Sequence, residues 1–189
     1  MTIEQPSNDM HPTLQLSQHY KKGCFGRVEL NHQTKRAIKL FHAKDTSEIF
    51  FETRPWENEI RKIVFADEVQ AYELANSCQD LRSLVPRFFG KRCFSSIKSE
   101  SGEDVSHLYL LDCCYEIELI DGQFIKLGKL ASYGVPQLEI DRITALFNGA
   151  GIKYTDDADA TTSCDLQRIE KVIDFATRNT YYEEENLRI

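Results

Sequence analysis

Two glycines, a lysine and an aspartate stand in an order that could hold a triphosphate and a metal ion. Gly23 and Gly26 lie in a stretch typical of a hairpin, and Lys39 lies in the strand-like run that follows. Asp174 comes much later, directly after a short apolar strand. A glycine backbone can lie close over phosphates, a lysine neutralises their charge, and an aspartate is a ligand for magnesium. This order suggests ATP and a metal ion.

Composition excludes several classes of protein. The chain has 189 residues, 41% hydrophobic and 28% charged, which is enough for one ordinary domain or two small lobes. Its net charge of -7 argues against a nucleic-acid groove, which needs clustered lysine and arginine. No apolar run approaches the roughly 20 residues that span a bilayer. We therefore expect neither a nucleic-acid partner nor a membrane span.

The N-terminus and the cysteines bear on location. The first ten residues lack the basic and apolar regions of a Sec signal peptide, and we expect residues 1–13 to form a disordered leader. The six cysteines have no Cys-x-x-Cys spacing, and two of them are adjacent, which suits neither a zinc site nor a disulfide framework. Reduced thiols in a cytosol are the natural interpretation.

Hydrophobic periodicity predicts the elements that must position these residues. Residues 14–30 predict two strands joined at the two glycines, and residues 36–41 predict a third. Residues 56–75 repeat apolar side chains near a period of 3.6, which predicts a long amphipathic helix after Pro55. The other expected elements are a strand at 85–94, a loop at 95–106, strands at 108–120 and 123–127, a helix at 136–148, a loop at 155–163 and a strand at 170–175.

Over roughly residues 14 to 178 the arrangement resembles the protein kinases. In the family's loop, G-x-G-x-x-G-x-V, Lys21 stands here at the first glycine, while the other two glycines and the valine remain. The family's strand Val-Ala-Ile-Lys is matched by the run that ends in Lys39. The resemblance implies that Lys39 holds the phosphates and that the nucleotide is contacted by these residues: Gly23, Cys24, Phe25, Gly26, Val28, Ala37 and Lys39.

The resemblance also implies an orienting carboxylate and an adenine-binding segment. A glutamate of the long helix should hold Lys39 in place; Glu68 is the first choice, with Glu59 and Glu73 as alternatives. The run that ends near Glu118 would contact the adenine ring through its backbone amides.

The catalytic and metal positions depart from the family pattern. Its His-x-Asp is replaced by Tyr154-Thr155-Asp156, with Asp156 as catalytic base, and its metal-binding asparagine falls at Thr161. Asp174 begins Asp-Phe-Ala where the family has Asp-Phe-Gly, and would hold magnesium. Asp159 or Asp157 could serve as the second ligand, because a carboxylate is an adequate hard donor.

The implied fold is α+β and two-lobed, with a nucleotide lobe at about 14–120 and a reduced second lobe at about 121–189. Little of the family's substrate-binding region follows Asp174, so the chain is similar to the minimal kinase-like effectors that bacterial pathogens inject into host cells. The resemblance implies a monomeric, ATP- and magnesium-dependent kinase, of serine/threonine type, that phosphorylates a specific host protein. It would reach the host cytoplasm by a non-Sec route such as type III secretion, and would otherwise be cytoplasmic.

Other interpretations stay open. The changed His-x-Asp and the lost asparagine favour a pseudokinase that binds a protein and transfers nothing, and a small-molecule kinase is a third possibility. The three aspartates at 156, 157 and 159 could form a solvated acidic loop, and Glu68 could be an exposed helix residue.

Overall fold

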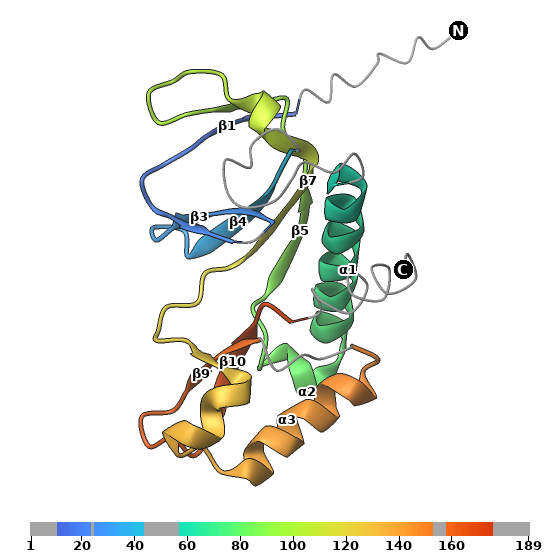
Figure 1. Ribbon diagram of the computed structural model, residues 1–189, viewed down its shortest axis with the longest axis vertical. Helices are drawn as coiled ribbons and strands as arrows, with labels where there is room; N and C mark the ends of the chain where they lie inside the picture. Colours follow the sequence, from blue (N-terminus) through green and yellow to red (C-terminus); the bar gives the residue numbers. More distant parts are fainter. Residues whose placement is uncertain (1–10, 24, 44–56, 153–157, 176–189) are drawn as a thin grey trace, which may run out of the picture.

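The computed structural model describes residues 11–23, 25–43, 57–152 and 158–175 (Figure 1). The described part is α+β, as the sequence predicted, with β-sheets and few helices. The predictions for Cys24, Pro55, Asp156 and Asp157 lie outside the described residues, as does the expected leader up to residue 10. No helix in the described ranges combines the length and the apolar character needed to cross a bilayer.

The largest sheet has five strands, and every neighbouring pair is antiparallel. In spatial order the strands are β2 (Tyr20–Lys22), β3 (Gly26–Asn31), β4 (Arg36–His42), β7 (Tyr109–Glu118) and β5 (Phe88–Arg92). The predicted hairpin and the third strand are confirmed. Along β4 the side chains alternate between the two faces, so Ala37, Lys39 and Phe41 share one face.

Helix α1 (Glu57–Ser77) lies along this face of the sheet (Figure 1). Its buried stripe includes Val64, Val69 and Tyr72, and confirms the predicted amphipathic helix. Asn76 ties the end of the helix to the sheet, because its amide donates to the Tyr72 carbonyl and its oxygen accepts from the Phe88 N–H. A short helix that the sequence pattern did not predict, α2 (Gln79–Arg82), follows.

The opposite face of the sheet is partly covered by a two-stranded parallel sheet, β1 (Thr13–Gln15) and β6 (Ser96–Lys98). Leu16 and Ile97 from this addition pack with Leu40 of β4 in a second, smaller core. The expected loop at 95–106 is therefore wrong at 96–98, and β1 begins inside the expected leader. Each strand is three residues long, which is too short for an alternating pattern to stand out. A single-turn helix, η2 (Ser106–Leu108), leads into β7.

The second half of the chain builds a three-stranded antiparallel sheet and two helical segments (Figure 1). The elements are β8 (Ile125–Lys126), η3 (Leu127–Tyr133), α3 (Gln137–Gly149), β9 (Asp159–Thr162) and β10 (Ile169–Ile173). The expected strand at 123–127 is reduced to two residues and passes into η3. The predicted loop at 155–163 is wrong at 159–162, because β9 pairs with strands on both sides and buries Ala160 and Thr161. Small and hydroxylated side chains give little hydrophobic signal.

The main hydrophobic core is continuous across the expected lobe boundary near residue 120. It contains Phe41 and Val64 from the first half together with Phe147 and Phe175 from the second. The Phe175 ring lies 4.8 Å from the ring of Tyr72 in α1 and 5.0 Å from that of Phe147 in α3, measured between centroids. This phenylalanine joins the two parts of the molecule directly.

Candidate active site

Lys39 lies at the interface between the sheet and α1. In the sheet register it stands opposite Val28 on β3 and opposite Tyr115 on β7. Directly opposed residues in a sheet point to the same face, so these three side chains form one row beneath α1. A lysine is rarely buried without a partner. Lys39 is buried here, which raises the question of what holds its charge.

Glu68 of α1 neutralises the charge of Lys39. The Lys39 ammonium donates to both carboxylate oxygens of Glu68, each at 2.7 Å, and the Glu68 side chain is only 2% exposed. Glu68 lies on the buried stripe of the helix, four residues after Val64 and four before Tyr72. Of the alternatives, Glu59 pairs with Lys62 on the outer surface, and Glu73 is exposed. The structure therefore brings together Lys39 and Glu68, the first choice from the sequence.

Burial dominates the electrostatics of this carboxylate. It raises the pKa of Glu68 above its ordinary value, against the lowering effects of the Lys39 charge and of hydrogen bonds from Lys39 and Tyr115. The Tyr115 hydroxyl donates to Glu68 Oε2 at 2.6 Å. Sequence reasoning did not identify Tyr115, which contributes a second donor to the same carboxylate.

Asp174 completes the group from the end of β10. Its Oδ1 lies 3.9 Å from the Lys39 ammonium, and its side chain is 51% exposed. The backbone of Asp174 has a φ of +59°, a left-handed conformation that aspartate and asparagine adopt more readily than other residues with side chains. A strand lysine, a helix carboxylate and an accessible carboxylate thus converge from three separate elements.

The glycine turn has two glycines with different requirements. The Gly23 N–H donates to the Gly26 carbonyl at 2.8 Å and closes the turn. A Cβ on Gly26 would overlap the backbone carbonyl of Leu40 and would lie 3.1 Å from the Phe41 Cα, so sheet packing requires glycine there. A Cβ on Gly23 would meet nothing closer than the Gly26 oxygen at 3.6 Å. Packing within the described residues therefore gives no reason for glycine at position 23.

The other expected nucleotide contacts lie at different places in the sheet and the core. Val28 and Ala37 share the face of Lys39. Phe25 packs against the main core, so its ring is placed by the fold. For Glu118 the sequence predicts contact with the adenine ring through the backbone, and this stays a prediction. Its side chain lies on the opposite face of β7 from Tyr115 by strand parity, and its amide donates to the Arg87 carbonyl.

Asp159 lies on β9, next to the strand β10 that precedes Asp174, and its carboxylate already forms an ion pair. It is the cross-strand partner of Ile173, the residue before Asp174, and its carboxylate lies 3.0 Å from the Lys126 ammonium. Thr161 is a buried residue of β9. Within the described ranges no group of three or more histidine, cysteine or acidic residues could hold a metal. Magnesium in proteins commonly takes one or two carboxylates together with phosphate oxygens, and Asp174 offers one accessible carboxylate of this kind.

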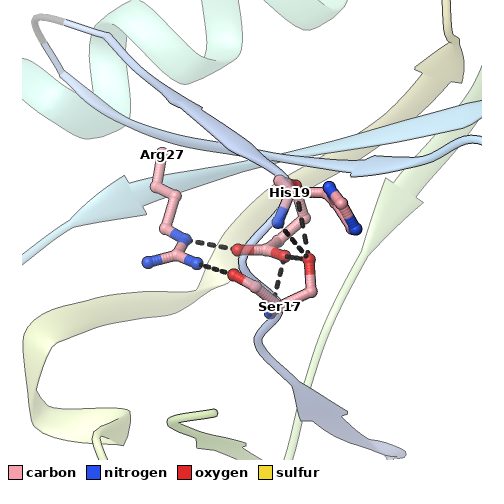
Figure 2. Close-up of polar contacts among 4 residues, drawn as sticks. Ser17, His19 and Arg27 are labelled. Carbon is pink, nitrogen blue, oxygen red and sulfur yellow. Dashed lines mark hydrogen bonds and ion pairs between the residues drawn. The ribbon is translucent and has the colours of Figure 1, made fainter.

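A second polar cluster, on the other face of the sheet, contains serine, histidine and glutamate but is not a catalytic triad. Figure 2 shows Ser17, His19 and Arg27 around it. The Ser17 hydroxyl donates to Glu29 Oε2 at 2.8 Å, and His19 contributes only backbone groups to Ser17, while its ring stacks edge-on against His32. Arg27 donates to Glu29 and to the Ser17 carbonyl. The cluster fastens the segment between β1 and β2 onto β3.

This cluster borders a cavity of about 590 Å³ between the β1 segment and the sheet. Two buried carboxylates line the cavity, and both have cationic partners from this chain: Glu29 has Arg27, and Glu116 has Arg36 and Arg92.

Comparisons of the chain with protein-family models, with curated proteins and with solved structures find no match.

Proposed function

We propose that this chain binds ATP with magnesium and transfers the γ-phosphoryl group to a hydroxyl of a protein, with a fold of protein-kinase type. The observation that carries the proposal is the convergence of Lys39, Glu68 and Asp174 within one hydrogen-bonded and ion-paired group. The strand β4 is the third of the five-stranded sheet along the chain, and protein kinases carry their phosphate-binding lysine on the third strand, paired with a helix glutamate.

The roles follow from charge and exposure. Lys39 would neutralise the α- and β-phosphates while Glu68 fixes its direction. Asp174, accessible to solvent, would hold magnesium, with Asp159 as the second carboxylate; the ion would neutralise charge on the phosphates. The space around Gly23 would let its backbone lie close over the phosphates. Asp156, the proposed base, lies outside the described residues.

A pseudokinase is the second candidate, and two observations favour it. The Lys126 ammonium forms an ion pair with the Asp159 carboxylate, and Thr161 is buried in β9 where the family has a metal-binding asparagine. A site with a single available carboxylate could bind a nucleotide, or hold a partner protein, without transferring phosphate.

The deciding experiment measures binding and transfer separately. Calorimetry with ATP and magnesium tests binding, and radiolabelled ATP tests transfer, with host-cell cytosol as the source of protein acceptors. Asp174→Asn should abolish transfer, whereas Asp141→Asn, which changes an exposed carboxylate on α3, should behave as wild type. Binding without transfer would favour the pseudokinase. If the wild type binds no ATP, both nucleotide proposals fail.

The proposed acceptor is a host protein, reached by a non-Sec route. A translocation reporter fused to the chain, expressed in a bacterium with and without a functional type III system, tests delivery. Reporter signal in the host cytoplasm from only the competent strain is the expected result.

A further inference from the structure

Tyr115 carries a hydroxyl into the centre of an aromatic cluster. Its side chain is fully enclosed, with the residue 2% exposed. The ring lies 6.4 Å from that of Phe65 in a stacked arrangement, 6.1 Å from that of Phe88 and 5.6 Å from that of Tyr72. Burying a hydroxyl without a partner costs free energy, and the ring contacts alone could be made by phenylalanine. The hydroxyl therefore calls for an explanation of its own.

The hydroxyl is directed at the Lys39–Glu68 pair. It donates to Glu68 Oε2 at 2.6 Å, the same oxygen that accepts from the Lys39 ammonium at 2.7 Å. Burial raises the pKa of Tyr115 well above its ordinary value, so the phenol keeps its proton and acts as a donor. Because Tyr115 stands directly opposite Lys39 in the sheet, this donor comes from the same rigid layer as the lysine itself.

The two donors to Glu68, Lys39 and Tyr115, differ in what else they must bind. Lys39 must turn part of its hydrogen-bonding capacity toward any phosphate that binds. Tyr115 has no such demand, and its ring is held by its neighbours. A glutamate on a helix that is fixed by the lysine alone would be free to rotate when the lysine engages a ligand. A second donor, fixed in the sheet, removes that freedom.

We propose that Tyr115 is a positioning residue that fixes the Glu68 carboxylate and, through it, the direction of the Lys39 ammonium. The positioning does not depend on which ligand binds. Its consequence for nucleotide affinity rests on the proposed function.

The test compares Tyr115→Phe with Tyr109→Phe in the full chain. Both variants remove the hydroxyl of a buried tyrosine on β7, but Tyr109 belongs to the second core and its hydroxyl is associated with Arg27. The first readout is the nitrogen-15 NMR signal of the Lys39 ammonium without ligand. In Tyr115→Phe we expect this signal to shift and its protons to exchange several-fold faster, whereas Tyr109→Phe should match wild type.

The second readout is the affinity for ATP with magnesium. Tyr115→Phe should bind more weakly by up to about five-fold, the limit set by the net value of about 1 kcal/mol for one hydrogen bond that the bound state needs more than the free state does. An unchanged Lys39 signal in a folded Tyr115→Phe variant would overturn the proposal, whatever the affinity. Absence of ATP binding by the wild type would instead overturn the proposed function, and the ammonium signal would still decide the role of Tyr115.

A measurement on the wild type alone covers the case in which Tyr115→Phe does not fold. A hydroxyl proton bonded to a buried carboxylate exchanges slowly with water and gives its own NMR signal. Detection of this proton for Tyr115, with a nuclear Overhauser contact to the Glu68 side chain, supports the proposal. A rapidly exchanging hydroxyl would refute it.

Discussion

The three charged residues of the candidate site differ in how they can be tested. Lys39 and Glu68 form a buried pair, and removing one partner of such a pair typically costs about 3–5 kcal/mol because the other charge is left uncompensated. Loss of activity in a Lys39 variant would therefore not separate chemistry from unfolding. Asp174 is half exposed and can be changed without leaving a buried charge alone. It is the residue on which function is best examined.

The choice of substitution at Asp174 matters because of its backbone. Asparagine adopts the left-handed conformation readily because its short polar side chain can hydrogen-bond to the local backbone, whereas alanine lacks such a group and pays about 1–2 kcal/mol there. We expect Asp174→Asn to unfold at nearly the wild-type urea concentration and Asp174→Ala to be less stable by about 1 kcal/mol. Equal stability of the two variants would show that the left-handed conformation is not held in solution.

The raised pKa of Glu68 predicts a pH dependence of stability. Unfolded Glu68 titrates near 4.5, and folded Glu68 titrates higher. Between these values the folded state binds more protons, so this residue makes the free energy of unfolding fall as pH rises. The described charged or titratable groups that act on it include Lys39 on β4, Tyr115 on β7, Asp174 after β10 and Tyr72 on its own helix.

Glu68→Gln should remove this contribution. Urea denaturation from pH 4.5 towards neutrality should show wild type losing stability relative to Glu68→Gln as pH rises. A constant difference between the two proteins across this range would contradict the direction of the pKa shift.

At this scale the sequence predicted the charged residues better than their surroundings. Lys39 and Glu68 were chosen from the resemblance to the kinase motifs, with an exposed Glu68 left as an alternative, and the structure buries both. Tyr115 and Glu118 depend on register between strands distant in sequence, and β4 and β7 are paired with an irregularity between Leu40 and His42. No local pattern encodes that pairing, which is why the sequence alone does not reveal the donor from Tyr115.

Among the elements, the hairpin of β2 and β3 shows that two glycines of one turn can be required for separate reasons. Gly26 is required by the close approach of β3 to β4, since any side chain would meet the Leu40 backbone. Gly23 has space around it. A requirement for glycine at position 23 would therefore come from a ligand and not from packing.

Gly26→Ala and Gly23→Ala form a matched pair. Gly26→Ala should destabilise the fold by about 1–3 kcal/mol, the usual cost of overpacking. Gly23→Ala should retain wild-type stability in urea but bind ATP with magnesium more weakly in calorimetry. Wild-type affinity in Gly23→Ala would remove the turn from the proposed site, and a fully stable Gly26→Ala would contradict the observed packing.

The elements that the sequence did not reveal are short or weakly hydrophobic. Strand β9 has one aspartate and two threonines around Ala160, and its pattern is that of a loop until partners on both sides supply hydrogen bonds. Strands β1 and β6 have one central hydrophobic residue each. By contrast α1 and α3 were predicted within two residues at each described end, because their periodicity extends over several turns.

For the whole molecule, the continuous core argues that the two halves unfold together. Phe175 is 1% exposed and contacts aromatic rings from both α1 and α3. The sequence suggested two lobes with a boundary near residue 120, but the packing of distant segments against one phenylalanine could not be inferred from local patterns.

Phe175→Ala tests this coupling. Deleting a buried phenylalanine ring typically costs about 3–5 kcal/mol. We expect the denaturation midpoint to fall, with coincident transitions by circular dichroism and by hydrogen exchange of β4 and α3 amides. Loss of protection in α3 while β4 keeps wild-type protection would show that the halves are independent.

Asp174 and Phe175 are consecutive residues, so a shift of the backbone at Phe175 would also move the backbone that carries the Asp174 carboxylate. The Phe175 ring is held on one side by Phe147 of α3. The 3.9 Å separation between Asp174 and Lys39 therefore depends on how α3 packs as well as on the residues beside the candidate site.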